Sequence, residues 1–180
     1  MNPTDALNRL IAGNRDVTEP SIETLRHFAQ NGQHPYAVVI TCSDSRVVPE
    51  RVFGCDIGEI FVVRTAGNVV GEFERGTVEY GTSHLGARLV VVLGHTHCGA
   101  VAAALEHHES ETPQSLAALV HEVAHGICDS RNAREAERLN VENSVARLRE
   151  SAALRAAEVS GDIEIKRAIY DIETREVAFW

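Results

Sequence analysis

Three short apolar runs, all rich in β-branched residues, lie in the first half of the chain. They cover residues 37–41, 60–63 and 89–93. An unbroken apolar run of this length is typical of a strand that is buried on both faces. We therefore predict three strands of a largely parallel sheet.

Helical patterns precede, separate and follow these runs. Capping residues, apolar spacing and stop signals predict helices over residues 4–13, 21–30, 77–85, 99–107 and 115–128, and a later helix that carries Val141, Val145, Leu148 and Ala152. A closing strand is expected between residues 163 and 172. Strands that alternate with helices indicate right-handed crossovers and an α/β fold.

The order of these elements favours a single α/β domain, with a mostly parallel central sheet flanked by helices. A length of 180 residues is sufficient for one sizeable core, and no internal repeat or linker interrupts the pattern. We expect residues 1–35 to form an N-terminal helical arm and residues 36–180 to form the α/β core.

Composition and charge narrow the possible partners. The formal net charge is -9, and no run of basic residues offers a surface for nucleic acid. No apolar stretch approaches the roughly 20 residues that cross a bilayer, and the first residues do not resemble a secretory signal. We therefore expect a cytoplasmic protein without a membrane partner. Four cysteines in that compartment favour metal ligands, nucleophiles or core residues over disulfides.

Soft metal ligands follow two of the predicted strands. Cys42 comes directly after the first apolar run, and His95 and Cys98 come directly after the third. Side chains at the carboxyl ends of parallel strands can converge in one crevice. Two thiolates and one imidazole suit Zn²⁺, and three protein ligands leave a fourth position open, as in a catalytic site. The sequence therefore predicts a zinc site at Cys42, His95 and Cys98.

Two further features bear on this predicted site. His97 is a rival ligand to His95, but His95 lies nearer the strand end and is favoured. Asp44 and Arg46 are close enough for a carboxylate–guanidinium pair, which would keep Asp44 ionised and orient it beside the metal.

A second zinc-like motif competes with the first. The segment from His121 to His125 reads H-E-V-A-H, which satisfies the H-E-x-x-H pattern of zinc metallopeptidases. The apolar face of its helix centres on Leu116, Val120, Val123 and Ile127. His121 and His125 then point away from that face, and no third histidine follows at the metzincin spacing. We expect a chance match.

The paired motifs Cys42-Ser-Asp-Ser-Arg and His95-x-x-Cys98 resemble those of β-class carbonic anhydrases, and the active site is closest to the plant-like subgroup. The likeness continues through most of the chain, in residues 7–14, 37–49, 58–68, 79–81, 94–101 and 168–171.

The resemblance implies the β-carbonic anhydrase fold, a homodimer or homotetramer, and the reversible, zinc-dependent hydration of CO₂ to bicarbonate and a proton, a lyase reaction. It implies Zn²⁺ on Cys42, His95 and Cys98, and catalysis by Asp44 with Arg46. In part of the family the matching Asp ligates the metal instead. The residues implied to contact substrate are Gln33, Phe61, Tyr80 and the backbone N–H of Gly99, with Tyr80 contributed across the dimer interface.

Some residues depart from the family pattern. Val39 stands where the bicarbonate-inhibited subgroup has Trp, so we expect no such regulatory site although Arg64 is present. Thr65 replaces the usual Asn, and Arg175 replaces the Gly of the closing turn. The remaining alternatives are a hydrolase for carbonyl sulfide or carbon disulfide on the same fold, and a non-catalytic zinc module that supports assembly.

Overall fold

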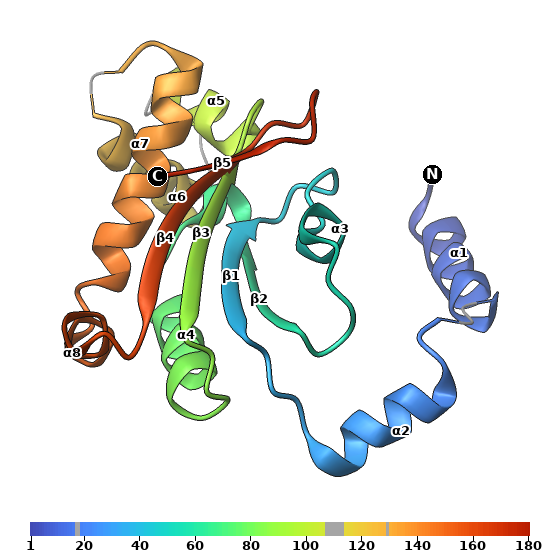
Figure 1. Cartoon of the computed structure of the whole chain (residues 1–180). Coiled ribbons are helices and arrows are strands. Elements are labelled where there is room, and N and C mark those ends of the chain that lie inside the picture. Colours follow the sequence, from blue (N-terminus) through green and yellow to red (C-terminus); the bar gives the residue numbers. More distant parts are fainter. Residues whose placement is uncertain (17–18, 107–113, 129) are drawn as a thin grey trace. The chain divides into compact units, whose positions relative to one another are not determined.

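A computed structural model of the chain describes residues 1–16, 19–106, 114–128 and 130–180 (Figure 1). These residues form two compact units, Met1–Gln33 and His34–Trp180. Within the described ranges, no helix combines the length and the apolar character needed to cross a bilayer.

The first unit consists of two helices, α1 (Pro3–Asp16) and α2 (Ile22–Asn31). Ser21 caps α2, because its Oγ accepts a hydrogen bond from the N–H of Thr24 at 3.1 Å. The predicted second helix is thus confirmed. The first helix continues three residues beyond its predicted end at Gly13, since a glycine weakens a helix without necessarily ending it.

The second unit is built on a five-stranded sheet in the order β2-β1-β3-β4-β5. The first four strands in that order are parallel, and the last is antiparallel to β4. The strands are β1 (Ala37–Cys42), β2 (Ile60–Thr65), β3 (Leu89–His95), β4 (Glu164–Tyr170) and β5 (Val177–Phe179). The three predicted apolar strands and the closing strand are confirmed. Strand β5 was not predicted, because its three residues are too few to show a period.

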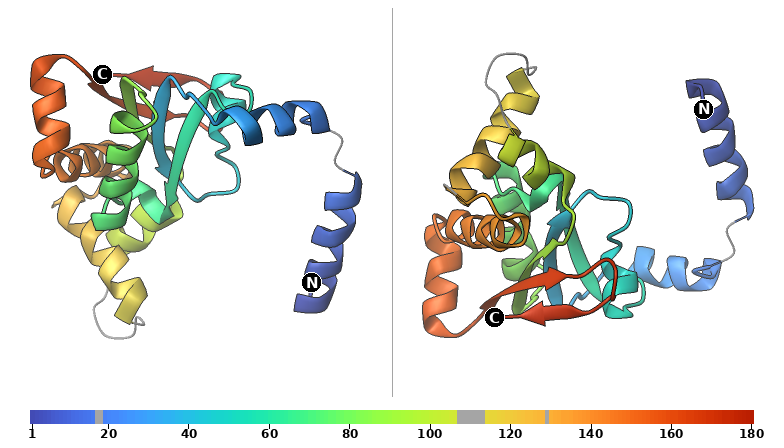
Figure 2. Two further views of the ribbon diagram at one scale, coloured as in Figure 1. Left: turned by 90° about the horizontal axis from the view of Figure 1, so that it is seen from below. Right: turned by 90° about the horizontal axis from the view of Figure 1, so that it is seen from above.

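Helices cover both faces of this sheet (Figure 2). One face packs against α4 (Glu72–Ser83), α7 (Ala133–Leu148) and α8 (Ala152–Ser160), and the other against the short α3 (Pro49–Phe53) and the segment that leads into β5. Helices α5 (Gly99–Glu106) and α6 (Gln114–Ile127) form a third apolar cluster with α7, and this cluster includes Cys42 and Cys98. A 3₁₀ turn, η1 (Ala66–Asn68), follows β2.

Three helices begin or end at other residues than predicted, and local interactions explain the differences. The late helix is two helices, because α7 ends at Leu148 and Ser151 caps α8 by accepting a hydrogen bond from the N–H of Leu154. Helix α4 begins five residues early, where the Glu74 carboxylate accepts the N–H of Gly71. Helix α6 stops before Cys128, whose φ of 52° is left-handed. The predicted end of α5 at residue 107 lies outside the described ranges.

The sheet order brings three strand ends together. Strand β1 lies between β2 and β3, and all three run in the same direction. Cys42 is the last residue of β1 and pairs with Thr65, while His95 is the last residue of β3. Two segments that are far apart in the sequence therefore present their side chains at one edge of the sheet.

Candidate metal centre

Three buried side chains meet at this edge. The Sγ atoms of Cys42 and Cys98 and a ring nitrogen of His95 all lie within 4.8 Å of one another. Each residue is at most 5% exposed. Among the residues that the structure describes, this is the only group of three such side chains close enough to share a metal ion. Two sulfurs and one nitrogen form a donor set that suits Zn²⁺.

The His95 ring is oriented as a ligand would be. Its Nδ1 lies 2.9 Å from the carbonyl oxygen of Thr96. Because a carbonyl only accepts, Nδ1 carries the proton and Nε2 keeps its lone pair. That Nε2 is buried and has no hydrogen-bond partner among the described residues. An unpaired buried nitrogen is costly, and a metal ion between the two cysteines would satisfy it.

The two thiols differ in acidity because they face each other. Contact with the Cys98 thiol lowers the pKa of Cys42 to about 4; burial opposes this shift, and the backbone N–H groups of Asp44 and Gly67 add to it. The same contact, together with burial, raises the pKa of Cys98. For His95, burial lowers the pKa, but contact with Cys42 and the Thr96 carbonyl outweighs it and the net shift is upward. A cation would favour the thiolate form of both cysteines.

The carboxylate of Asp44 is held by Arg46. Nε of Arg46 donates to Oδ1 at 2.9 Å and Nη2 donates to Oδ2 at 2.7 Å, which is a bidentate pair. The Arg46 guanidinium holds the pKa of Asp44 well below its usual range. The same Nη2 also donates to the carbonyl of His97 at 3.1 Å, so the pair connects the loop after β1 with the turn after β3.

Arg64 fixes the backbone of the loop after β1. Its Nε donates to the carbonyl of Cys42 at 3.2 Å, and its Nη2 donates to the carbonyls of Asp44 and Val47 at 2.7 and 2.8 Å. One guanidinium thus spans the loop that contains Cys42 and Asp44.

Val39, which stands where the bicarbonate-inhibited subgroup has Trp, is buried in β1.

His97 is not part of the group of three. Its φ of 58° is left-handed, its side chain is 56% exposed, and its Nε2 lies 3.5 Å from a carboxylate oxygen of Glu173. The structure thus places His95, and not its rival, beside the two cysteines.

The H-E-x-x-H motif is not assembled into a site. His121 and His125 are exposed on α6. Glu122 is bound by two neighbours, because Arg147 donates to both of its oxygens at 2.7 and 2.8 Å and Asn143 donates to Oε1 at 2.9 Å. A carboxylate held in this way is not placed to act as a general base. The predicted outward direction of the two histidines is confirmed, although Leu116, expected on the apolar face, is 50% exposed.

The expected substrate contacts lie in different parts of the chain. Gly99 is exposed at the first residue of α5, next to Cys98. Phe61 and Tyr80 lie 6.1 Å apart, centroid to centroid. Phe61 pairs with Val38, four residues or about 13 Å along the strand from Cys42, so this pair lies away from the three ligands. Gln33 ends the first unit.

Sequence reasoning missed a group of polar residues on α7. Glu137, Asn140 and Ser144 are each at most 4% exposed and follow the spacing of one helical face. Glu137 contacts the backbone of Cys98, and Asn140 and Ser144 contact η1, whose Gly67 N–H donates to the Cys42 sulfur. A signal was present, because polar residues at this spacing interrupt an otherwise apolar helix face beside Val141 and Val145.

Comparisons with known proteins agree with this geometry. Residues 37–177 match the family model described as carbonic anhydrase. The chain is 31% identical to a carbonic anhydrase of Pseudomonas aeruginosa in an alignment of 188 positions, gaps included, that covers 96% of this chain and 85% of that protein. It is 44% identical to carbonic anhydrase 2 of Mycobacterium tuberculosis over 97 residues, or 54% of this chain and only 46% of the relative.

Solved structures share the whole fold. The β-carbonic anhydrase CcaA superposes with a TM-score of 0.81 at 26% identity, over 98% of this chain and 88% of that chain. One of two tetrameric β-carbonic anhydrases from Sordaria macrospora superposes with a TM-score of 0.74 at 24% identity, over 98% of this chain and 94% of that one.

Proposed function

Because the chain belongs to the β-class carbonic anhydrase family, we propose that it catalyses the zinc-dependent, reversible hydration of CO₂ to bicarbonate and a proton. One observation carries the proposal: two buried sulfurs and a ring nitrogen of His95, whose Nε2 has no hydrogen-bond partner among the described residues, converge within 4.8 Å beside the ends of adjacent strands. Cys42, His95 and Cys98 would hold Zn²⁺ and leave a fourth position for the reaction.

The bound metal would supply Lewis acidity, which lowers the pKa of water toward neutrality. The protein's own residues supply orientation. Asp44 stays ionised because Arg46 donates hydrogen bonds to both of its oxygens. Each carboxylate oxygen has a further lone pair, which can accept a hydrogen bond from the substrate. We propose that Asp44 accepts this hydrogen bond and orients the reacting oxygen toward CO₂. Arg64 holds the Asp44 backbone in place by its bonds to the surrounding carbonyls.

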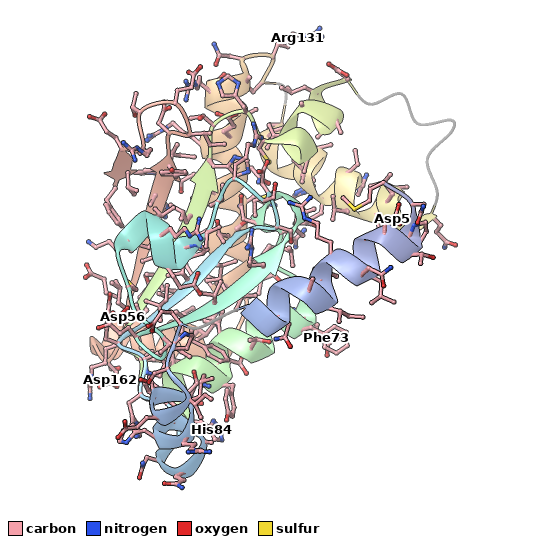
Figure 3. The ribbon with its side chains drawn as sticks, turned by 90° about the vertical axis from the view of Figure 1, so that its right-hand side faces the viewer. Asp5, Asp56, Phe73, His84, Arg131 and Asp162 are labelled. Carbon is pink, nitrogen blue, oxygen red and sulfur yellow. The ribbon has the colours of Figure 1, made fainter. Side chains whose placement is uncertain are left out.

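The proposed active form is a homo-oligomer in the cytoplasm. Phe73 and Tyr80 are 84% and 48% exposed on α4, and the side chain of Phe73 stands away from its helix (Figure 3). Apolar side chains of α1 are also exposed. Large exposed apolar residues on several elements are typical of protein interfaces. We propose that assembly brings Tyr80 to the substrate site of a neighbouring copy, as the family resemblance implies, and that Phe61 and Gln33 reach such a site in the same way.

Stopped-flow CO₂ hydration with parallel measurement of bound zinc tests the function. We expect one zinc per chain and rapid hydration at neutral and mildly alkaline pH. A zinc-loaded protein without hydration activity would refute the proposal. If it instead hydrolysed carbonyl sulfide or carbon disulfide, the same site would serve a different substrate. Inactivity toward all three would indicate a non-catalytic zinc module.

A further inference from the structure

The inner face of α7 contacts the backbone around both cysteines of the metal centre. Cys42 lies in β1 and Cys98 in the turn before α5, and neither is close to α7 in the sequence. Two polar side chains one turn apart on α7 reach toward them: Glu137 bonds the backbone of Cys98, and Asn140 bonds Gly67 in η1, which in turn contacts Cys42. Both are almost fully buried, at 4% and 1% exposure.

Asn140 acts on Cys42 through the turn after β2. Its Nδ2 donates to the carbonyl of Gly67 at 2.6 Å, and the N–H of the same Gly67 donates to Sγ of Cys42 at 3.2 Å. Gly67 has a left-handed φ of 64°, and an added Cβ would meet the Cβ of Ala100 at 2.9 Å. The peptide can therefore approach the sulfur only as glycine and only in this conformation.

Neighbouring bonds fix the same turn. Ser144, one turn beyond Asn140, donates to the carbonyl of Asn68 at 2.8 Å, and Asn68 Nδ2 donates back to Ser144 Oγ at 3.1 Å. These buried bonds join α7 to the turn at Asn68 as well as at Gly67, and hydrogen bonds that share residues strengthen one another. The direction of the Gly67 N–H is therefore set from α7.

Glu137 acts on Cys98. Its Oε1 accepts the backbone N–H of Cys98 at 3.3 Å, while its Oε2 is buried without a partner among the described residues. A buried, unpaired carboxylate oxygen is unfavourable in the absence of a positive charge. A divalent cation at the neighbouring cysteines would supply that charge.

We propose that Asn140 and Glu137 are positioning residues of the metal centre: Asn140 orients the Gly67 N–H toward the Cys42 sulfur, Glu137 fixes the backbone of Cys98, and both thereby set metal affinity. The inference rests on the proposed metal site. Residues that orient the ligands of a metal from the outside are part of the site, and loss of such outer contacts typically lowers metal affinity by 10- to 100-fold.

Asn140→Ala tests the first half of the proposal against Asn143→Ala. Both asparagines lie on α7 and donate side-chain hydrogen bonds, but Asn143 bonds only Glu122 among the described residues. We expect Asn140→Ala to lose about tenfold or more in zinc affinity, measured by competition with a chelator. We expect it also to shift the sulfur-to-cobalt charge-transfer band of the Co²⁺-substituted protein. Asn143→Ala should change neither, whatever it costs in stability.

Glu137→Ala tests the second half, because it removes the acceptor for the Cys98 N–H. We expect zinc affinity to fall by about tenfold, and Glu137→Gln, which keeps an acceptor there, should restore most of it. Unchanged affinity and spectra in both the Asn140 and Glu137 variants, with only the unfolding free energy lowered, would overturn the proposal and leave α7 a purely structural role.

A measurement on the unaltered protein covers the case in which the variants do not fold. In the ¹¹³Cd-loaded chain, the amide proton of Gly67 should show a scalar coupling to cadmium through the Cys42 sulfur. Cadmium binding without this coupling refutes the orienting role of Asn140. A failure to bind cadmium or zinc at all refutes the metal site itself, so the two failures are distinguishable.

Discussion

Two segments of this chain carry zinc-like sequence signals, and the fold treats them in opposite ways. The proposed ligands Cys42, His95 and Cys98 come from the ends of two strands and the turn after the second, and they are brought together in a buried group. His121 and His125 are four residues apart on one helix, but both are exposed and their intervening Glu122 is bound by Arg147. Proximity in the sequence does not make a site. Burial, a free lone pair and the absence of a competing partner distinguish the two.

The strongest test of this comparison removes ligands from each segment. Cys98→Ala should abolish stoichiometric zinc and reduce CO₂ hydration to the uncatalysed rate, because two protein ligands bind zinc too weakly. The double variant His121→Ala/His125→Ala should keep both. Metal analysis and stopped-flow assays report the result; zinc lost from the histidine variant would reverse the assignment.

The next test compares the two carboxylates. Asp44→Asn should retain zinc and lose about a hundredfold or more in turnover, because the amide offers a donor where the reaction needs an acceptor. Glu122→Gln should leave turnover unchanged. Wild-type rates for Asp44→Asn at full zinc occupancy would remove Asp44 from the mechanism.

Glu122 should instead matter for stability in acid. Burial raises the pKa of Glu122, but the hydrogen bonds from Arg147 and Asn143 outweigh it, so the net shift is downward. A lowered pKa means that the folded state favours the ionised carboxylate. The contribution of ionised Glu122 to the unfolding free energy is therefore complete when the pH is above the ordinary pKa of a glutamate. It is lost as the pH falls through the lower pKa of Glu122 in the folded state. Glu122→Gln should cost about 1 kcal/mol in the unfolding free energy at neutral pH and less in acid. Parallel curves for variant and wild type across pH would contradict this assignment.

The smallest effect on zinc binding and stability is expected for His97, which lies within the His95-x-x-Cys98 motif. His97→Ala should keep full zinc and change the unfolding free energy by less than about 0.5 kcal/mol, since its side chain is exposed and meets only a surface carboxylate. Denaturant titration with zinc analysis checks both. Loss of zinc would mean that His97 had been the ligand after all.

The apolar runs predicted the strands correctly because burial on both faces leaves a strong compositional signal. The convergence of Cys42 with His95 also followed from strand ends in a parallel sheet. The sequence did not reveal the break between α7 and α8, because a cap at Ser151 is a short-range event within a continuous apolar pattern. It also did not reveal Asn140, whose role depends on a turn distant in the sequence.

The separation of the ligands along the chain has a consequence for folding. Cys42 precedes the whole β2–α4 crossover and Cys98 follows it, so an ion held by both would close a long loop of the polypeptide. A cross-link of that kind removes conformational freedom from the denatured chain, and for covalent bridges the effect is typically about 2–4 kcal/mol. Withdrawal of the ion by a chelator should therefore lower the free energy of global unfolding as well as stop turnover.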